Sequence, residues 1–508
     1  MASSSTSLPP SASPFSPPSS ILIVGSGVFG LSTALALARR HVFARCSITV
    51  VDRSDPSQPG AFPSPDAASV DTSRIVRADY ADPAYAALAD EAQAEWRKQD
   101  TPASLGAQGR YNETGLLLVG DATPPEPPAA AAPAGEGSKP KLTGLDYVRM
   151  SWANVSSLAA KNPELAARVQ ELPDPDAIRA ALGTGGSSGS WGYINKNSGW
   201  ADATASMAWL LDQVQQTRRV DFVAGTVVSL EHDETTVTGA KLSDGRVLSA
   251  DLVIVAAGAW TGGLVDLGGQ AVATGQVLGY IDITEAEQEK LANMPVVLNL
   301  STGLFIIPPT DRVLKIARHA YGYINPVTLP HPPLPLSPTH PPPANPTVSL
   351  PRTSLIDSNL SIPAEGAADL RRALREMIPW PALCSRPFRR TRLCWYSDTA
   401  TGDFLIDYHP GWRGLFVATG DSGHAFKFLP VIGDKIADCI AGACPPEFRA
   451  KWAWKAASAS ASAAGSGSGS DSLAWSTVVT EDGSRGGTPG LVLADELAKS
   501  PKEVPAHD

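Results

Sequence analysis

The sequence has little cysteine. Five of its 508 residues are cysteines, at positions 46, 384, 394, 439 and 444. They are too few and too scattered for a disulfide framework or a zinc site, so we expect no metal. A reducing compartment is the simplest interpretation, and we expect a cytoplasmic protein. A peroxisomal location is the alternative, although the chain ends in Ala506-His507-Asp508 and not in Ser-Lys-Leu.

The sequence also lacks an excess of positive charge and long apolar runs. Its formal net charge is −10, which argues against nucleic acid or an anionic membrane surface as the main partner. Residues 1–20 have neither the basic start nor the apolar core of a signal peptide, and no apolar run reaches the length of a bilayer. We expect small-molecule partners, no nucleic acid, no membrane, and a monomeric chain.

A glycine-rich turn near the start of the chain is the strongest motif that is present. The apolar run 21–24 predicts a buried strand, and Gly25, Gly27 and Gly30 follow with the spacing G-x-G-x-x-G, with Val28 and Phe29 between them. A helical pattern comes next, and a second apolar strand over 48–51 ends on Asp52.

Each of these residue types suits a dinucleotide. Glycines let backbone N–H groups approach a pyrophosphate, the helix N-terminus adds partial positive charge, and a carboxylate after the second strand can bond ribose hydroxyls. The alternative is a structural strand–helix–strand unit without a ligand.

Two later segments repeat this pattern of a strand that runs into small residues. The apolar run 252–255 leads into Ala256-Ala257-Gly258-Ala259, where the backbone can approach a cofactor. A second run over 415–418 leads into a loop of small and polar residues over 419–428, and Pro430 then predicts a helix start.

Six motifs in chain order resemble the flavin amine oxidases of the monomeric sarcosine oxidase group, which includes fungal pipecolate and saccharopine oxidases and fructosyl amino acid oxidases. They are GSGVFG, the SRIVR segment, AAGAW, Lys315, LCWYSDT and GDSGHAFKFLPVIG. The resemblance covers residues 21–442 apart from the insertions. It implies an FAD cofactor, with oxygen as a second partner.

The resemblance also implies roles for single residues. Cys394 would attach the flavin covalently, and its alternative is a buried core thiol. Arg77 and Lys427 would hold the substrate carboxylate by paired hydrogen bonds and charge, and their alternative is a pair of surface charges. Lys315 would face the flavin and promote oxygen reduction, because a fixed ammonium in a dry site stabilises developing negative charge. Its alternative is an outward-facing lysine on a strand.

Further positions match the family's active site or its cofactor contacts. His319 and Tyr396 match positions near the substrate, Arg74 falls beside the flavin ring, and His424 lies near the flavin pyrimidine; structural histidines are the alternative. The implied cofactor contacts also include Asp52, Arg53, Ser73, Val227, Ala257, Gly258, Asp421, Gly423 and Lys427.

The implied reaction is oxidation of a secondary amine or an N-substituted amino acid to an imine, with hydrogen peroxide as the second product. Fructosyl amino acid oxidases carry an Asp-Glu pair after the oxygen-activating lysine, where this chain has Arg318 and His319, so a sugar-bearing substrate is the weaker alternative. Two others are an oxidase or demethylase of a secondary-metabolite amine and a non-catalytic dinucleotide-binding interaction protein.

The expected fold class is α/β, a Rossmann-type FAD-binding domain with a second antiparallel β-sheet plus helix substrate domain. We assign 21–110, 195–265 and 405–447 to the FAD-binding domain, and 111–194 and 266–404 to the substrate domain. Proline-rich insertions near 121–141 and 326–351 interrupt the substrate domain, and the second is expected as an extended surface segment. Residues 1–20 and 448–508 are expected as a disordered arm and a disordered tail.

Overall fold

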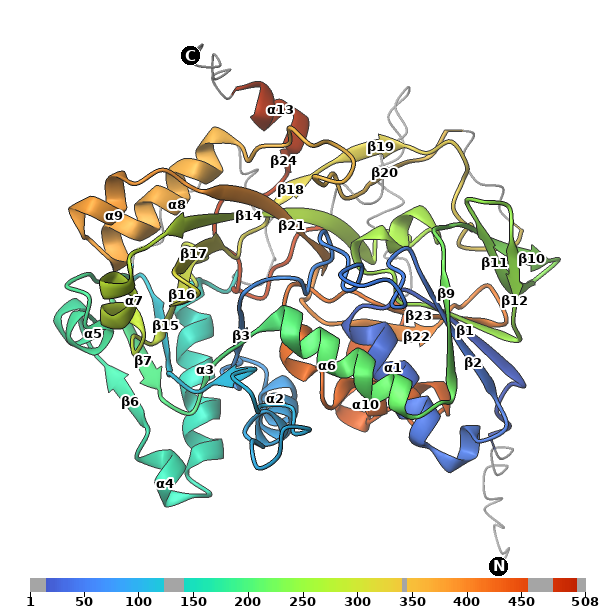
Figure 1. Cartoon of the computed structure of the whole chain (residues 1–508), viewed down its shortest axis with the longest axis horizontal. Helices are drawn as coiled ribbons and strands as arrows, with labels where there is room; N and C mark the ends of the chain where they lie inside the picture. Colours follow the sequence, from blue (N-terminus) through green and yellow to red (C-terminus); the bar gives the residue numbers. More distant parts are fainter. Residues whose placement is uncertain (1–14, 123–140, 340–344, 456–477, 500–508) are drawn as a thin grey trace, which may run out of the picture.

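The computed structural model describes residues 15–122, 141–339, 345–455 and 478–499. They form two packed halves, each organised around one sheet (Figure 1). The α/β fold class predicted from the sequence is confirmed.

The nucleotide half is built on a six-stranded sheet with strand order β22-β23-β13-β1-β2-β9. Its strands are parallel except for the β22–β23 pair. They are β1 (Ser20–Val24), β2 (Ser47–Asp52), β9 (Val220–Ala224), β13 (Leu252–Val255), β22 (Leu405–Tyr408) and β23 (Leu415–Thr419). The central strands are continuous apolar runs because helices and a small sheet cover their two faces.

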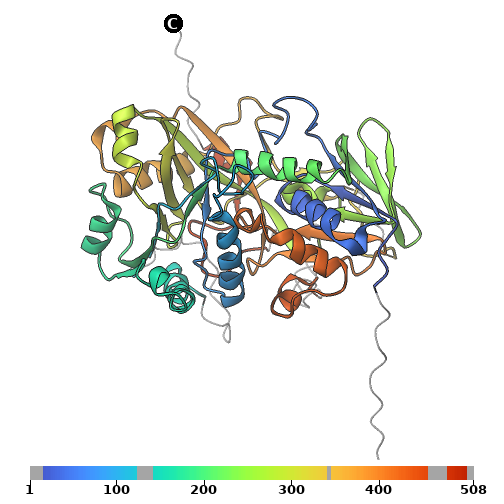
Figure 2. The same ribbon diagram turned by 60° about the horizontal axis from the view of Figure 1, so that its bottom comes forward.

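Three helices pack together on this sheet. Helix α1 (Val28–Arg39) contacts both α6 (Ala203–Gln216) and α10 (Ile432–Ile440), and Figure 2 shows it between them. A three-stranded antiparallel sheet of β10 (Val227–Asp233), β11 (Thr236–Leu242) and β12 (Val247–Ser249) follows β9.

The second half contains a ten-stranded sheet with order β24-β18-β14-β17-β16-β15-β5-β7-β6, and β21 also pairs with β14. Its strands are β5 (Leu116–Gly120), β6 (Val169–Leu172), β7 (Trp191–Asn195), β14 (Ala271–Asp282), β15 (Val296–Asn299), β16 (Leu304–Thr310), β17 (Val313–Arg318), β18 (Tyr323–Ile324), β21 (Arg390–Thr399) and β24 (Leu491–Val492). Most pairs are antiparallel as predicted, but β5 pairs parallel with β15 and β18 parallel with β24.

Helices and short strands complete the molecule. The helices are α2 (Pro83–Trp96), α3 (Gly144–Ala159), α4 (Pro163–Ala166), α5 (Pro175–Leu182), α7 (Glu285–Leu291), α8 (Ala364–Met377), α9 (Pro381–Ser385), α11 (Pro446–Trp452) and α13 (Leu493–Ala498). A small sheet of β3 (Arg74–Val76), β8 (Gly199–Ala201) and β4 (Tyr111–Asn112) lies where the two halves meet, and β19 (Pro326–Thr328) pairs with β20 (Thr347–Ser349).

The expectation of disordered ends is not tested over residues 1–14, 456–477 and 500–508, which lie outside the described part of the chain, as does 123–140 of the first proline-rich insertion. It is wrong for 15–20, because the Phe15 ring packs at 5.8 Å from that of Phe43 and Ser20 begins β1. It is also wrong for 448–455 and 478–499, which include part of α11, β24 and α13. Phe448 and Trp452 are buried and β24 pairs with β18, so contacts with distant segments fix these residues in place. The other domain boundaries stay a prediction.

Candidate active site

The glycine turn between β1 and α1 has the geometry that close backbone approach requires. Gly25 has φ +106°, and a side chain there would lie 2.5 Å from the Ala256 carbonyl oxygen. A side chain at Gly30 would lie 1.9 Å from the Gly25 carbonyl oxygen, whereas one at Gly27 would meet nothing within 4 Å. Gly25 and Gly30 are therefore packing positions, and Gly27 is the open side of the turn.

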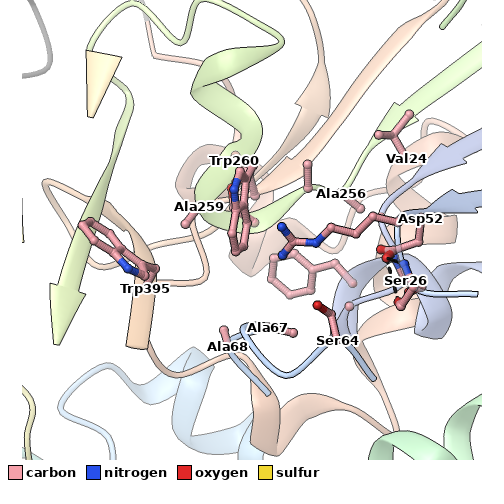
Figure 3. Close-up of a pocket in the computed structure, with 18 of the residues that line it drawn as sticks. Val24, Ser26, Asp52, Ser64, Ala67, Ala68, Ala256, Ala259, Trp260 and Trp395 are labelled. Atoms are coloured by element: carbon pink, nitrogen blue, oxygen red, sulfur yellow. Dashed lines mark hydrogen bonds between the residues drawn. The ribbon is translucent and has the colours of Figure 1, made fainter. Parts of the chain in front are cut away.

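This turn borders a cavity of about 440 Å³ between the two halves. Figure 3 shows Val24, Ser26 and Asp52 on one side of it and Trp395 on the other, with Ala67, Ala68 and Trp260 between them. The predicted cofactor residues that line it are Gly25, Gly27, Val28, Phe29, Asp52, Arg53, Arg74, Val227, Ala257, Gly258, Asp421 and Gly423.

The lining matches the chemistry of a dinucleotide. The Asp52 carboxylate ends β2 and accepts hydrogen bonds from Ser26 N and Ser54 N, each at 2.8 Å, so it is fixed at the mouth of the glycine turn. Arg53 lies over the Trp260 ring at 4.4 Å and pairs with Asp66 at 2.5 Å. A glycine cradle, a fixed carboxylate and a mostly apolar cavity together fit FAD.

A smaller cavity of about 80 Å³ adjoins the first, and Arg74, Tyr396, Gly423 and Phe426 line both. Besides Arg74 and Gly423, seven of its residues were assigned from the sequence to catalysis, substrate binding or flavin contact: Arg77, Lys315, His319, Cys394, Tyr396, His424 and Lys427. They come from segments up to 350 residues apart in sequence, and the fold brings them to one place. The carbonyl oxygen of Ser73, another predicted cofactor contact, accepts a hydrogen bond from Lys315.

Lys315 is held on β17 by a buried ion pair. Its Nζ lies 2.7 Å from Asp71 Oδ2 and donates to the Ser73 carbonyl oxygen at 2.6 Å, and the side chain is 2% exposed. Burial and the charge of Arg74 lower the pKa of Lys315 to about 7, although Asp71 opposes the shift. Arg74 also pairs with Asp71, and these cations hold the pKa of the Asp71 carboxyl below its ordinary value in spite of burial.

Arg77 and Lys427 also line the smaller cavity. Arg77 is 5% exposed, and its Nη1 has no hydrogen-bond partner among the described residues. Lys427 Nζ donates to Tyr80 Oη at 2.9 Å and to the His424 carbonyl oxygen at 2.8 Å. Burial and repulsion by Arg77 lower the pKa of Lys427 well below its usual value. Both groups are thus poised for an anion that would pair with them.

Cys394 lies on β21 at the border of the two cavities. Its Sγ is 3.5 Å from Arg74 Nη2 and 3.7 Å from the Ala68 carbonyl oxygen, and the residue is 2% exposed. Arg74 and Ala68 also line the large cavity. The thiol is therefore next to the cofactor cavity.

The sequence did not reveal Arg485, which reaches the site from the C-terminal segment. Its Nη2 donates to Asp398 Oδ1 and to the Ser422 carbonyl oxygen, each at 2.7 Å, and its Nη1 lies 2.9 Å from His319 Nδ1. Burial and the charge of Arg485 lower the pKa of His319 well below its ordinary value, so the imidazole is neutral. A polar segment rich in glycine carries no pattern that would have marked this arginine.

Tyr80 and Asp421 are two further polar residues of the site. Tyr80 Oη lies 2.9 Å from His424 Nδ1, so it links this histidine to Lys427. Asp421 accepts from Ser397 N at 2.8 Å, and burial raises the pKa of its carboxyl to about 7. Tyr80 was also missed, because a tyrosine before a helix start has no distinguishing spacing.

Every helix among the described residues is too short or too polar to span a bilayer. Within the same residues no cluster of histidine, cysteine and carboxylate side chains could hold a metal ion.

The chain is similar to known oxidases over most of its length. The model of a family described as FAD dependent oxidoreductase matches residues 20–439. The amino acid oxidase imqH of Aspergillus flavus is 35% identical over 468 residues, which cover 83% of this chain and 93% of that protein. L-saccharopine oxidase of Schizosaccharomyces pombe is 30% identical over 447 residues, which cover 86% and 93%.

Among solved structures, the deglycating enzyme fructosamine oxidase (Amadoriase II) of Aspergillus fumigatus, in complex with FSA, matches with a TM-score of 0.69 at 27% identity. The match covers 94% of this chain and 95% of that chain.

Proposed function

The chain belongs to the family of FAD-dependent oxidoreductases, and from that premise we propose that it oxidises a secondary amine or an N-substituted amino acid, with oxygen as the electron acceptor. When bound, FAD would take a hydride from the carbon next to the amine nitrogen and pass the electrons to oxygen, giving hydrogen peroxide and an imine that hydrolyses. A non-catalytic interaction protein does not fit this family.

The observation that carries the proposal is the unpartnered Nη1 of buried Arg77 next to Lys427. A substrate carboxylate between them would satisfy Arg77 and favour the charged form of Lys427, which burial and Arg77 now disfavour. Tyr80 would keep the ammonium of Lys427 in place through its 2.9 Å hydrogen bond. Held by its carboxylate, the substrate would present its amine toward the large cavity.

The same charges favour the neutral form of the bound amine. Arg74, Arg77 and Lys315 line the smaller cavity, and none of its lining residues is an aspartate or glutamate. A cationic, buried site lowers the pKa of a bound ammonium, and the neutral amine is the form that can release hydride. No protein base is required for that step. His319, held neutral, and Tyr396 would then border the substrate without adding charge.

We assign covalent attachment of FAD to Cys394, because its thiol lies at the border of the cofactor cavity, 3.5 Å from Arg74 Nη2. Lys315 would serve the reaction with oxygen, since its ammonium is fixed beside the same border. We also propose that the enzyme works as a monomer, which sedimentation of the purified chain would test.

The alternative substrate is a fructosyl amino acid, which the similarity to fructosamine oxidase favours. The two positions that are acidic in fructosyl amino acid oxidases are here Arg318, which pairs with Glu365 and Asp369 at 2.8 Å, and His319, which contacts Arg485. The 80 Å³ cavity also favours a small substrate over a large secondary-metabolite amine.

Peroxide release from sarcosine, pipecolate, saccharopine and fructosyl-valine tests the proposal. We expect turnover of one or more of the secondary amino acids. Turnover of fructosyl-valine with none of the other three would refute the substrate class. An Arg77→Gln variant should lose activity on the amino acid but keep it on an amine of similar size that has no carboxylate.

A further inference from the structure

The proline-rich insertion is not a free surface segment. We call its described residues, 326–339 and 345–350, the strap. Strands β19 and β20 pair antiparallel at its base, with Pro326 opposite Ser349 and Thr328 opposite Thr347. Figure 1 shows them along the upper edge of the molecule, between β18 and the sheet of β10, β11 and β12.

One end of the strap is fixed to the large sheet. Ser349 Oγ donates to the Ala273 carbonyl oxygen on β14 at 2.7 Å. Asn325, directly after β18, donates from its backbone N to Ser349 Oγ at 2.9 Å and from Nδ2 to the Leu350 carbonyl oxygen at 2.8 Å. This end is therefore attached to the substrate half.

The middle of the strap is fixed to the nucleotide half. Leu334 is 6% exposed, its N donates to the Leu264 carbonyl oxygen at 2.9 Å, and its own carbonyl oxygen accepts from Asp266 N at 2.8 Å. Trp412 Nε1 donates to the Pro335 carbonyl oxygen at 2.6 Å, and the Trp412 ring lies 4.7 Å from that of His232 on β10. The middle of the strap therefore lies beside β10, the strand that begins with Val227.

Between these two anchors the strap borders the cofactor cavity. Leu329, Pro330, His331 and Leu350 line it together with Asp52, Val227 and Val228. Of these strap residues only His331 has a polar side chain, and it is exposed at the cavity's edge. An imidazole there can stack on a base or exchange a hydrogen bond with a ribose hydroxyl or a phosphate.

We propose that the strap is part of the cofactor site and closes the nucleotide end of the cavity, with His331 in contact with the adenosine half of FAD. Leu329, Pro330 and Leu350 supply an apolar cover that excludes water. The prolines fix the backbone before binding, so little conformational entropy is lost when the cofactor enters. This role rests on the flavin cofactor of the family and is independent of the amine substrate.

The test measures binding and not turnover. The Cys394→Ala chain is freed of flavin, so that any covalent link does not mask dissociation, and is titrated with ADP for the nucleotide half and with FMN for the flavin half. Adding His331→Ala should weaken ADP and FAD about five- to tenfold, the effect of one lost hydrogen bond. Binding of FMN should stay within twofold.

His41→Ala is the matched control, because His41 is an exposed histidine of the nucleotide half that does not line the cavity. It should leave all three affinities unchanged. Equal ADP affinity in the His331→Ala and His41→Ala variants would overturn the proposal, as would a loss confined to FMN. As a second measurement, ADP should slow hydrogen exchange at the amides of Leu329 and His331, and unchanged exchange there would also count against it.

Discussion

Replacing Lys315 by methionine tests whether this residue acts in the reaction with oxygen and not in the oxidation of the amine. The change keeps most of the side-chain length and removes the ammonium that pairs with Asp71 at 2.7 Å and donates to the Ser73 carbonyl oxygen at 2.6 Å. Because the residue is 2% exposed, bulk water cannot take the place of the ammonium and stabilise negative charge there. Asp71 keeps Arg74 as a partner, so we expect the variant to fold.

The expected loss follows from Coulomb's law. A unit charge about 4 Å from a developing negative charge contributes about 4 kcal/mol at an effective dielectric constant of about 20. That is about a thousandfold in a rate constant. The loss should fall on the reaction with oxygen, since Arg77 and Lys427, not Lys315, would hold the substrate.

Stopped-flow mixing separates the two half-reactions. Reduction by substrate without oxygen should stay within about tenfold of the unmodified enzyme, and reoxidation by oxygen should slow about a thousandfold. Lys290→Met, an exposed lysine on α7, is the control and should change neither rate. Reoxidation within tenfold of normal, or an equal loss in both half-reactions, would refute the proposed role.

The pH dependence of the same step gives a second check. Burial and the charge of Arg74 lower the pKa of Lys315 to about 7, so its ammonium is present below that pH and is lost above it. The rate constant for reoxidation should therefore fall as the pH rises through about 7. In the Lys315→Met variant this fall should be absent, and an unchanged fall would assign it to another group.

Three further changes give distinct outcomes. Acid-precipitated enzyme should stay yellow, and Cys394→Ala should release its FAD into the supernatant; colour lost from both would show that no covalent link forms. Arg77→Gln should raise KM for a substrate with a carboxylate about 30- to 150-fold, because a hydrogen bond to a charged group contributes about 2–3 kcal/mol. Equal KM values for the variant and the unmodified enzyme would contradict carboxylate binding. Arg485→Ala should lower the free energy of unfolding by about 3–5 kcal/mol because Asp398 loses its buried partner. It should also move the His319 pKa upward, visible as a shifted acid limb of the pH–rate profile, whereas Arg485→Lys should restore most of both.

The nucleotide half was predictable because its signals are local. The run 21–24, the glycines at 25, 27 and 30, and Asp52 all lie within 32 residues, and each has a physical reason that needs no distant contact. Their spacing alone predicts strand, turn, helix and strand, and the structure has β1, α1 and β2 there.

The cationic residues of the smaller cavity could be identified only by resemblance to a family. Arg77, Lys315 and Lys427 are separated by more than 100 residues from one another, and nothing in their local sequence distinguishes a buried charge from a surface one. Burial and the partners Asp71 and Tyr80 come from packing between the two halves.

The sequence by itself therefore determined the α/β class and the glycine turn, since these depend on local spacing and residue type, and its resemblance to a family supplied a candidate set of site residues. Only the tertiary structure decided what the polar and proline-rich segments do. Arg485 enters the site from a segment expected to be disordered, and the strap lines the cofactor cavity instead of extending into solvent. The places of both segments are set by hydrogen bonds to residues far away in the sequence, which no short stretch of sequence encodes.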